Sequence, residues 1–151
     1  MKEYLLLMIV GLCVMFSGCN YSGTPVEWAN ICDKANDDKY VEVVGYFKNT
    51  GSAMCSNSVN SSTMRCPIDF LESPTSEKMA VRAYLDKASG ASSIDNPEDK
   101  GLKIKDDKGE YVENSQKVKI VATLKVLDSP PSQVGKSAGC YLTVKKIEKA
   151  Q

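Results

Sequence analysis

Apolar and polar residues alternate with a period of two along most of the chain after residue 39. Such alternation predicts β-strands with one buried face, because successive side chains of a strand point to opposite sides of its sheet. The pattern predicts a mainly β domain with five strands. These are Tyr40 to Phe47, Met64 to Leu71, Met79 to Leu85 with a continuation at Leu102 to Lys105, Val118 to Val126, and a last strand opened by Cys140.

Three positions interrupt the alternation and predict local irregularities. Gly45, within the first strand, predicts a bend where another backbone approaches. Pro67 lacks a backbone N–H and confines the second strand to an edge or a bulge. In the last strand the apolar positions change phase before Ile147, which predicts a β-bulge at Lys145 and Lys146.

A helical period precedes the strands. Thr24-Pro25-Val26-Glu27 has the form of a capping box with proline at the first helical position. The next apolar positions recur at i, i+3, i+4 and i+7, which predicts a short helix with one face toward the core. They are Trp28, Ile31, Cys32 and Ala35, and the stripe favours core packing for Trp28 over ligand stacking or a place at a membrane interface.

Two polar stretches separate the later strands. Residues 86–101 are rich in Ser, Asp, Gly and Lys, which predicts a long exposed excursion with little burial. Residues 102–112 have the pattern of a hairpin, in which Lys108-Gly109 supplies the positive φ of a tight turn.

The first residues have a different character. An apolar run from Tyr4 to Phe16 is long enough for the core of a signal peptide and too short to span a bilayer. It ends on Phe16-Ser17-Gly18-Cys19, which resembles the lipobox of bacterial lipoprotein precursors. The resemblance implies cleavage before Cys19 and acylation of that cysteine, with palmitate among the expected chains. An ordinary secretory signal that leaves Cys19 free is the alternative.

The same resemblance implies a location. We expect a cell-envelope protein held to the membrane by its acyl chains, because two or more chains give stable anchoring. Asn20 follows the cysteine in place of aspartate. In a Gram-negative host that implies export to the outer membrane.

Four cysteines follow Cys19, and an even number in an exported chain predicts two disulfides. Three pairings exist. We favour Cys55 with Cys66, which closes a loop rich in Ser and Asn, and Cys32 with Cys140, which joins the two ends of the domain. The spacings lack the close ligand pairs of a zinc site and the C-x-x-C of a redox site.

Composition limits the function classes. The chain has 19 basic and 19 acidic residues and no histidine. Zero net charge disfavours a polyanionic partner such as nucleic acid, and the common general base is missing. The acidic stretches do not fit a calcium loop. We therefore expect a protein that is not an enzyme and has no metal or cofactor, with a hydrolase of unrecognised site as the alternative.

The strand order, with KVKIVATLKVLD and YLTVKKIEK as the last two strands, resembles the oligonucleotide/oligosaccharide-binding (OB) barrel. In particular it resembles bacterial lipoproteins whose exported domain is similar to anticodon-binding modules. The resemblance implies a five-stranded OB-like barrel preceded by a short N-terminal helix, with a β-sandwich as the alternative. On this interpretation, residues 1–18 are the signal peptide, residues 19–24 are the lipidated cysteine and a short tether, and residues 25–151 form a single OB-like domain.

An OB barrel ordinarily binds on the face of its second and third strands, framed by two loops. Here that face includes Arg65, Asp69, Arg82 and Tyr84, framed by Lys48 to Thr63 and Ser129 to Ala138. We expect a protein or saccharide component of the envelope as the ligand. A structural envelope protein without a small ligand is a further alternative. The outward lysines, Lys117, Lys119, Lys125 and Lys145, are either contacts for anionic lipid headgroups or a solvated strand face.

Overall fold

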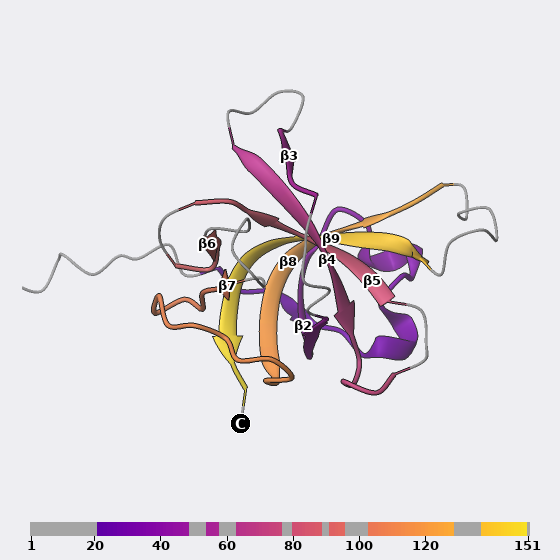
Figure 1. Cartoon of the computed structure of the whole chain (residues 1–151). Helices are drawn as coiled ribbons and strands as arrows, with labels where there is room; N and C mark the ends of the chain where they lie inside the picture. The colour runs from indigo at the N-terminus through magenta and orange to yellow at the C-terminus, as the bar shows by residue number, and fades with distance from the viewer. Residues whose placement is uncertain are drawn as a thin grey trace, which may run out of the picture.

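The computed structural model describes residues 21–48, 54–57, 63–76, 80–88, 91–95, 103–128 and 137–150. Within them, five long strands close into a barrel, with short elements at its ends and one side (Figure 1). The long strands are β2 (Tyr40–Lys48), β4 (Met64–Leu71), β5 (Ala80–Asp86), β8 (Val118–Val126) and β9 (Ser137–Lys149).

Strand pairing identifies the type of barrel. The sheet runs β2-β8-β9-β5-β4, and a β2–β4 pairing at Tyr46 to Lys48 closes it. All of these contacts are antiparallel except that between β5 and β9. Numbered along the chain, the long strands follow the cyclic order 1-2-3-5-4, which is the order of an OB-like barrel. The predicted fold class is confirmed in place of the sandwich.

Four short strands complete the described structure. β1 (Thr24–Pro25) pairs in parallel with β2, and β3 (Ser56–Asn57) pairs with β4. β6 (Ile94–Asp95) and β7 (Lys103–Ile104) form a separate two-stranded sheet.

The barrel interior contains the apolar positions that the alternation predicts. The largest fully buried side chains come from all five long strands and from β6. They include Val41, Val43, Phe70, Val81, Leu85, Ile94, Val118, Ile120, Leu124, Leu142 and Ile147. Burial of this kind contributes about 25 cal/mol per Å² of apolar surface, so this core is the main source of stability.

Both predicted disulfides are present. Cys32 is joined to Cys140, with their Cα atoms 5.3 Å apart, and so connects the segment before β2 to the last strand. Cys55 is joined to Cys66 and so fixes part of the first long loop against β4.

The predicted N-terminal helix has a different form. Thr24 and Pro25 are extended in β1, so Thr24 does not cap a helix. Two 3-10 turns follow in the described structure, η1 (Trp28–Asn30) and η2 (Lys34–Asn36). The capping pattern reflects only the local sequence. Residues 24–25 instead pair with residues 41–42 of β2, and this tertiary contact keeps them extended.

Trp28 packs against the core, as its position in the apolar stripe predicts. Its ring stacks on Phe70 with a centroid separation of 5.5 Å. Its indole N–H donates a hydrogen bond of 2.6 Å to the carbonyl of Val44. The apolar body of the indole is therefore covered while its polar group has a partner.

The excursion between β5 and β7 is not uniformly exposed, which contradicts the prediction for residues 86–101. Ser93 and Ile94 are buried, because Ile94 pairs with Ile104 and joins the core. The turn at residues 108–109 is confirmed: Gly109 has a φ of +80°, and Lys105 bridges to Tyr111.

The irregularities within the long strands also match the predictions. Gly45 is buried against the backbone of Leu71. Pro67 lies in a gap on one side of β4, because β3 pairs with residues 64–65 and β2 with residues 69–71. Between β8 and β9, Val121 pairs with Lys146 and the next residue of β8, Ala122, pairs with Val144. Lys145 of β9 is therefore the extra residue of a bulge.

Candidate functional site

The four predicted binding residues lie together on the outer face of β4 and β5. The strands pair antiparallel, with Asp69 opposite Arg82 and Arg65 opposite Asp86. Tyr84 lies between these two pairs, opposite Pro67. Their neighbours in sequence, such as Cys66 and Ala83, are buried, so the alternation turns the four side chains outward.

Each arginine of this face forms an ion pair with an aspartate across the two strands. Arg65 Nε lies 3.3 Å from Asp86 Oδ1, and Arg82 Nε lies 3.2 Å from Asp69 Oδ1. All four side chains are partly exposed, so the pairs contribute little to folding stability. Their main effect is on the chemistry of the surface. The guanidinium groups offer planar hydrogen-bond donors and the carboxylates offer acceptors, while an aspartate balances the positive charge of each arginine.

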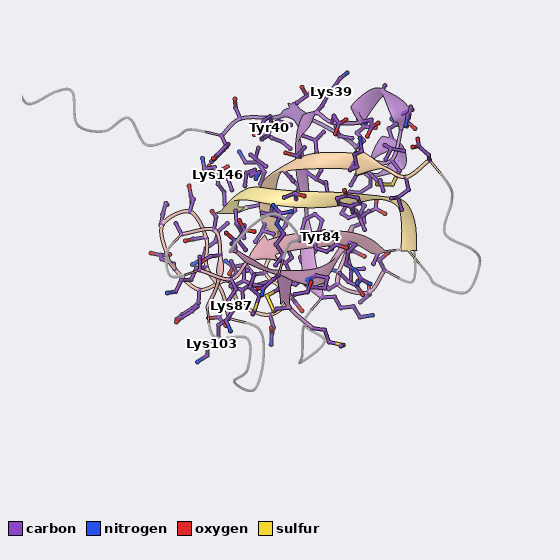
Figure 2. The ribbon with its side chains drawn as sticks, turned by 90° about the horizontal axis from the view of Figure 1, so that it is seen from above. Lys39, Tyr40, Tyr84, Lys87, Lys103 and Lys146 are labelled. Atoms are coloured by element: carbon purple, nitrogen blue, oxygen red, sulfur yellow. A yellow bond between two sulfur atoms is a disulfide. The ribbon has the colours of Figure 1, made fainter. Side chains whose placement is uncertain are left out.

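A second tyrosine extends the aromatic part of the face. Tyr141 of β9 contacts Tyr84 edge to face, with ring centroids 5.5 Å apart. The parallel register places Tyr141 opposite Arg82. We call Arg65, Asp69, Arg82, Tyr84, Asp86 and Tyr141 the β4–β5–β9 face (Tyr84 is labelled in Figure 2).

Sequence reasoning missed Tyr141 and Asp86. The alternation already turned Tyr141 outward, because Cys140 and Leu142 are inward positions. Its place beside Tyr84 depends on the parallel β5–β9 pairing, which joins strands that are far apart in the sequence. If the fifth strand is counted as part of the binding face, its alternation alone indicates Tyr141.

The loops predicted to frame this face lie largely outside the described residues. The described part of the first, residues 54–57 and 63, includes β3, which pairs with Met64 and Arg65. The Cys55–Cys66 disulfide is adjacent to Arg65 along β4. One end of the face is therefore held by a covalent bond and a backbone pairing.

A different part of the surface contains a cleft that the sequence did not predict. Its volume is about 440 Å³. It lies between β2, β8, the end of β9 and the turn after β7. The lining residues are Val44, Asp106, Asp107, Lys108, Lys119, Glu148, Lys149 and Ala150.

Glu148, which lines the cleft, forms ion pairs with one lysine of β8 and one lysine of β9. Lys119 Nζ lies 2.6 Å from a carboxylate oxygen of Glu148, and Lys146 Nζ lies 2.8 Å from the other. The hydrogen bonds from Lys119 and Lys146 lower the pKa of Glu148 below its ordinary range. The hydrogen bond to Glu148 raises the pKa of both lysines. Glu148 is ionised at neutral pH, so these ion pairs suit electrostatic support of the barrel rather than proton donation.

Asp106 is a buried side chain that also lines the cleft. Its Oδ1 accepts hydrogen bonds from the backbone N–H groups of Lys108, at 3.0 Å, and Glu110, at 2.8 Å. Lys149 Nζ lies 3.8 Å from its other oxygen. These contacts hold the turn around Gly109, and they account for the burial of a charged group.

In the described ranges, no cluster of three or more His, Cys, Asp or Glu side chains is arranged to hold a metal ion. No helix within those ranges is long and apolar enough to cross a bilayer. The predicted signal peptide and Cys19 lie outside the described residues.

No protein-family model matches the sequence, and no curated protein matches it at a significant level. Among solved structures, the chain is similar to one described as an aspartyl-tRNA synthetase from Leishmania major Friedlin, with 13% sequence identity and a TM-score of 0.44. The match covers 97% of this chain and spans a quarter (25%) of the length of that protein. At this TM-score the match adds nothing to the assignment made from strand order.

Proposed function

We propose that the protein is a non-catalytic, lipid-anchored envelope protein whose OB-like barrel binds a saccharide or protein component of the envelope through the β4–β5–β9 face. The observation that supports binding is the Tyr84–Tyr141 pair between two charge-compensated Arg–Asp pairs. Surface aromatics of this kind, with a few polar groups fixed around them, are typical of binding sites.

The chemistry of the face favours a neutral polar ligand, and a saccharide in particular. Tyrosine rings present apolar faces to the C–H groups of a sugar, while the guanidinium and carboxylate groups donate and accept hydrogen bonds from its hydroxyls. A polyanion would gain little, because both arginines already face aspartates and few counterions would be released.

Location and anchoring are part of the proposal. The lipobox-like Phe16-Ser17-Gly18-Cys19 supports acylation at Cys19. The two disulfides support an oxidising compartment, because such bonds persist outside the cytosol. We therefore propose a protein on the extracytoplasmic side of its membrane, which is the outer membrane if the host is Gram-negative.

Two of the described carboxyl groups, those of Asp37 and Glu148, are unsuited to act as a general acid. A glycosidase needs one carboxyl group with a raised pKa as its general acid. The pKa values of Asp37 and Glu148 are shifted in the other direction. A hydrogen bond from the backbone N–H of Val126 lowers the pKa of Asp37, and Lys119 and Lys146 lower that of Glu148.

Capture from detergent-solubilised envelopes tests binding. The wild-type lipoprotein should retain a glycan or protein that Tyr84→Ala/Tyr141→Ala does not retain. Tyr111→Ala is the matched control, because Tyr111 is an exposed tyrosine of the turn region. Equal capture by all three proteins would refute binding at the β4–β5–β9 face. Turnover of a saccharide or peptide would refute the non-catalytic assignment.

Acyl labelling tests anchoring separately. Wild-type protein should incorporate labelled palmitate, and Cys19→Ala should not. Normal incorporation by Cys19→Ala would contradict the anchor.

A further inference from the structure

Two exposed tyrosines meet where the described chain begins. The rings of Tyr21 and Tyr40 have centroids 6.2 Å apart, with 42% of Tyr21 and 46% of Tyr40 exposed. Lys39, next to Tyr40, is also exposed. We call Tyr21, Lys39 and Tyr40 the tyrosine edge. Tyrosine is enriched where membranes meet water, because its ring suits the headgroup layer and its hydroxyl stays hydrated.

The sequence places this edge close to the proposed acyl chains. Tyr21 is two residues after Cys19. Two extended residues span at most ~7 Å, which is about the thickness of one headgroup layer. An acylated Cys19 would therefore hold Tyr21 at the lipid surface.

Backbone pairing transmits that restraint to the barrel. Thr24 pairs with Val41, and the N–H of Val26 donates a hydrogen bond of 3.0 Å to the carbonyl of Glu42. A β-carbon on Gly23 would lie 2.6 Å from the carbonyl carbon of Val41, so the two backbones are in close contact. The segment from Gly23 to Val26 is thus fixed on β2, and an acylated Cys19 would lie only four residues before it in the sequence.

Charge distinguishes Lys39 from other lysines of this side of the barrel. Lys119 pairs with Glu148, and Lys125 pairs with Asp38 at 2.8 Å. Within the described residues, no carboxylate lies in ion-pair distance of Lys39. A lysine of this kind is attracted to the surface of a membrane that contains anionic lipid.

The ligand face lies on another part of the barrel. Tyr40 is at the start of β2, opposite Thr123 of β8, whereas Tyr84 is on β5, which does not border β2. Figure 2 shows Lys39 and Tyr40 at one side of the barrel and Lys87 and Lys103 at the opposite side.

We infer that the tyrosine edge is a lipid-contact surface, which lies on the headgroups of the anchoring membrane and leaves the β4–β5–β9 face accessible to envelope ligands. The inference rests on the proposed acylation of Cys19. It adds an orientation that acylation alone does not give, since a flexible tether would allow every face to meet the membrane.

Chemical acetylation of the lysines of the vesicle-bound protein tests this orientation. The mature lipoprotein is added to preformed vesicles of phosphatidylethanolamine and phosphatidylglycerol, and exposed lysines are acetylated with a membrane-impermeant reagent. Peptide mass spectrometry then compares Lys39 with Lys103, an exposed lysine on the opposite side that serves as the internal control. The Lys39 to Lys103 labelling ratio should be about fivefold lower for wild type than for Tyr21→Ser/Tyr40→Ser.

The outcomes separate the orientation from the anchor. Vesicle flotation with equal labelling ratios for wild type and variant would overturn the lipid-contact surface while the anchor stands. Failure to float would refute the anchor and the inference together. Protection of Lys39 in intact cells but not on vesicles would show that an envelope protein, rather than lipid, covers the edge. An unchanged unfolding transition in Tyr21→Ser/Tyr40→Ser confirms that the variant is folded.

Discussion

Gly45 of β2 lies directly against the backbone of Leu71 in β4. A β-carbon at residue 45 would collide with the carbonyl oxygen of Leu71, and it would lie 2.8 Å from Trp28 Cζ2 and 2.9 Å from Phe70 Cε1. This contact lies beside the β2–β4 pairing that closes the barrel. Glycine is therefore required where the first and second long strands meet.

Gly45→Ala should destabilise the barrel by about 3 kcal/mol, because the colliding atom belongs to the backbone and cannot rotate away. Chemical denaturation measures the change in the free energy of unfolding. Gly139→Ala is the control, since a β-carbon at residue 139 would have no neighbour within 4 Å. Equal stabilities for the two variants would contradict the close approach.

The two disulfides should stabilise the protein unequally. Cys32 and Cys140 are 108 residues apart and Cys55 and Cys66 only 11, while Cys66 and Cys140 are both fully buried. In the chain-entropy model the longer loop contributes about 4.7 kcal/mol and the shorter about 3 kcal/mol.

Cys32→Ala/Cys140→Ala should therefore lose about 2 kcal/mol more than Cys55→Ala/Cys66→Ala. Denaturant titration of both double variants measures the difference. A larger loss for the Cys55–Cys66 pair would show that local order of the first loop outweighs loop length.

Glu148 should contribute to stability at neutral pH and lose that contribution in acid. Hydrogen bonds from Lys119 and Lys146 lower its pKa in the folded state below the ordinary value of 4.5. The stabilisation is therefore complete above pH 4.5 and disappears as the pH falls through the folded-state pKa.

Glu148→Gln should flatten the dependence of unfolding free energy on pH below 4.5. Lys119→Gln/Lys146→Gln should flatten it similarly, because it removes the two cations while Glu148 remains. Thermal unfolding between pH 2 and 7 makes the comparison. A wild-type slope in both variants would exclude this ion-pair network as a source of acid sensitivity.

Tyr84 and Tyr141 should be energetically coupled even without a ligand. Edge-to-face aromatic pairs contribute about 0.5–1.5 kcal/mol beyond the area that they bury. A double-mutant cycle with Tyr84→Ala, Tyr141→Ala and the combined variant measures the coupling in the free energy of unfolding. Purely additive losses would mean that the two rings do not interact in solution.

The sequence predicts the barrel well because its inner faces follow a local rule. Period-two alternation gives the bounds of β4 and β8 without error and those of β2 within a residue, and the phase change before Ile147 gives the bulge. Of the three possible cysteine pairings, the favoured one is confirmed: Cys55–Cys66 closes a loop, and Cys32–Cys140 joins the two ends of the domain.

The remaining features depend on contacts between distant segments. Thr24 and Pro25 fit a helix start locally, but pairing with β2 makes them a strand. Ile94 stands alone in a polar stretch and is buried because Ile104 lies opposite it. Tyr141 belongs to the candidate site through the parallel β5–β9 pairing. Alternation within one segment cannot predict which distant segment that segment pairs with.

Nuclear magnetic resonance of the isotope-labelled protein can locate binding at the β4–β5–β9 face residue by residue. Soluble glycan fragments released from the host envelope are titrated into the protein while amide and ring signals are followed. We expect chemical-shift changes confined to Tyr84, Tyr141 and their strand neighbours, and we expect these changes to be lost in Tyr84→Ala/Tyr141→Ala. Shifts confined to the cleft around Val44 and Lys119, or a glycan response that survives in the double variant, would contradict binding at this face.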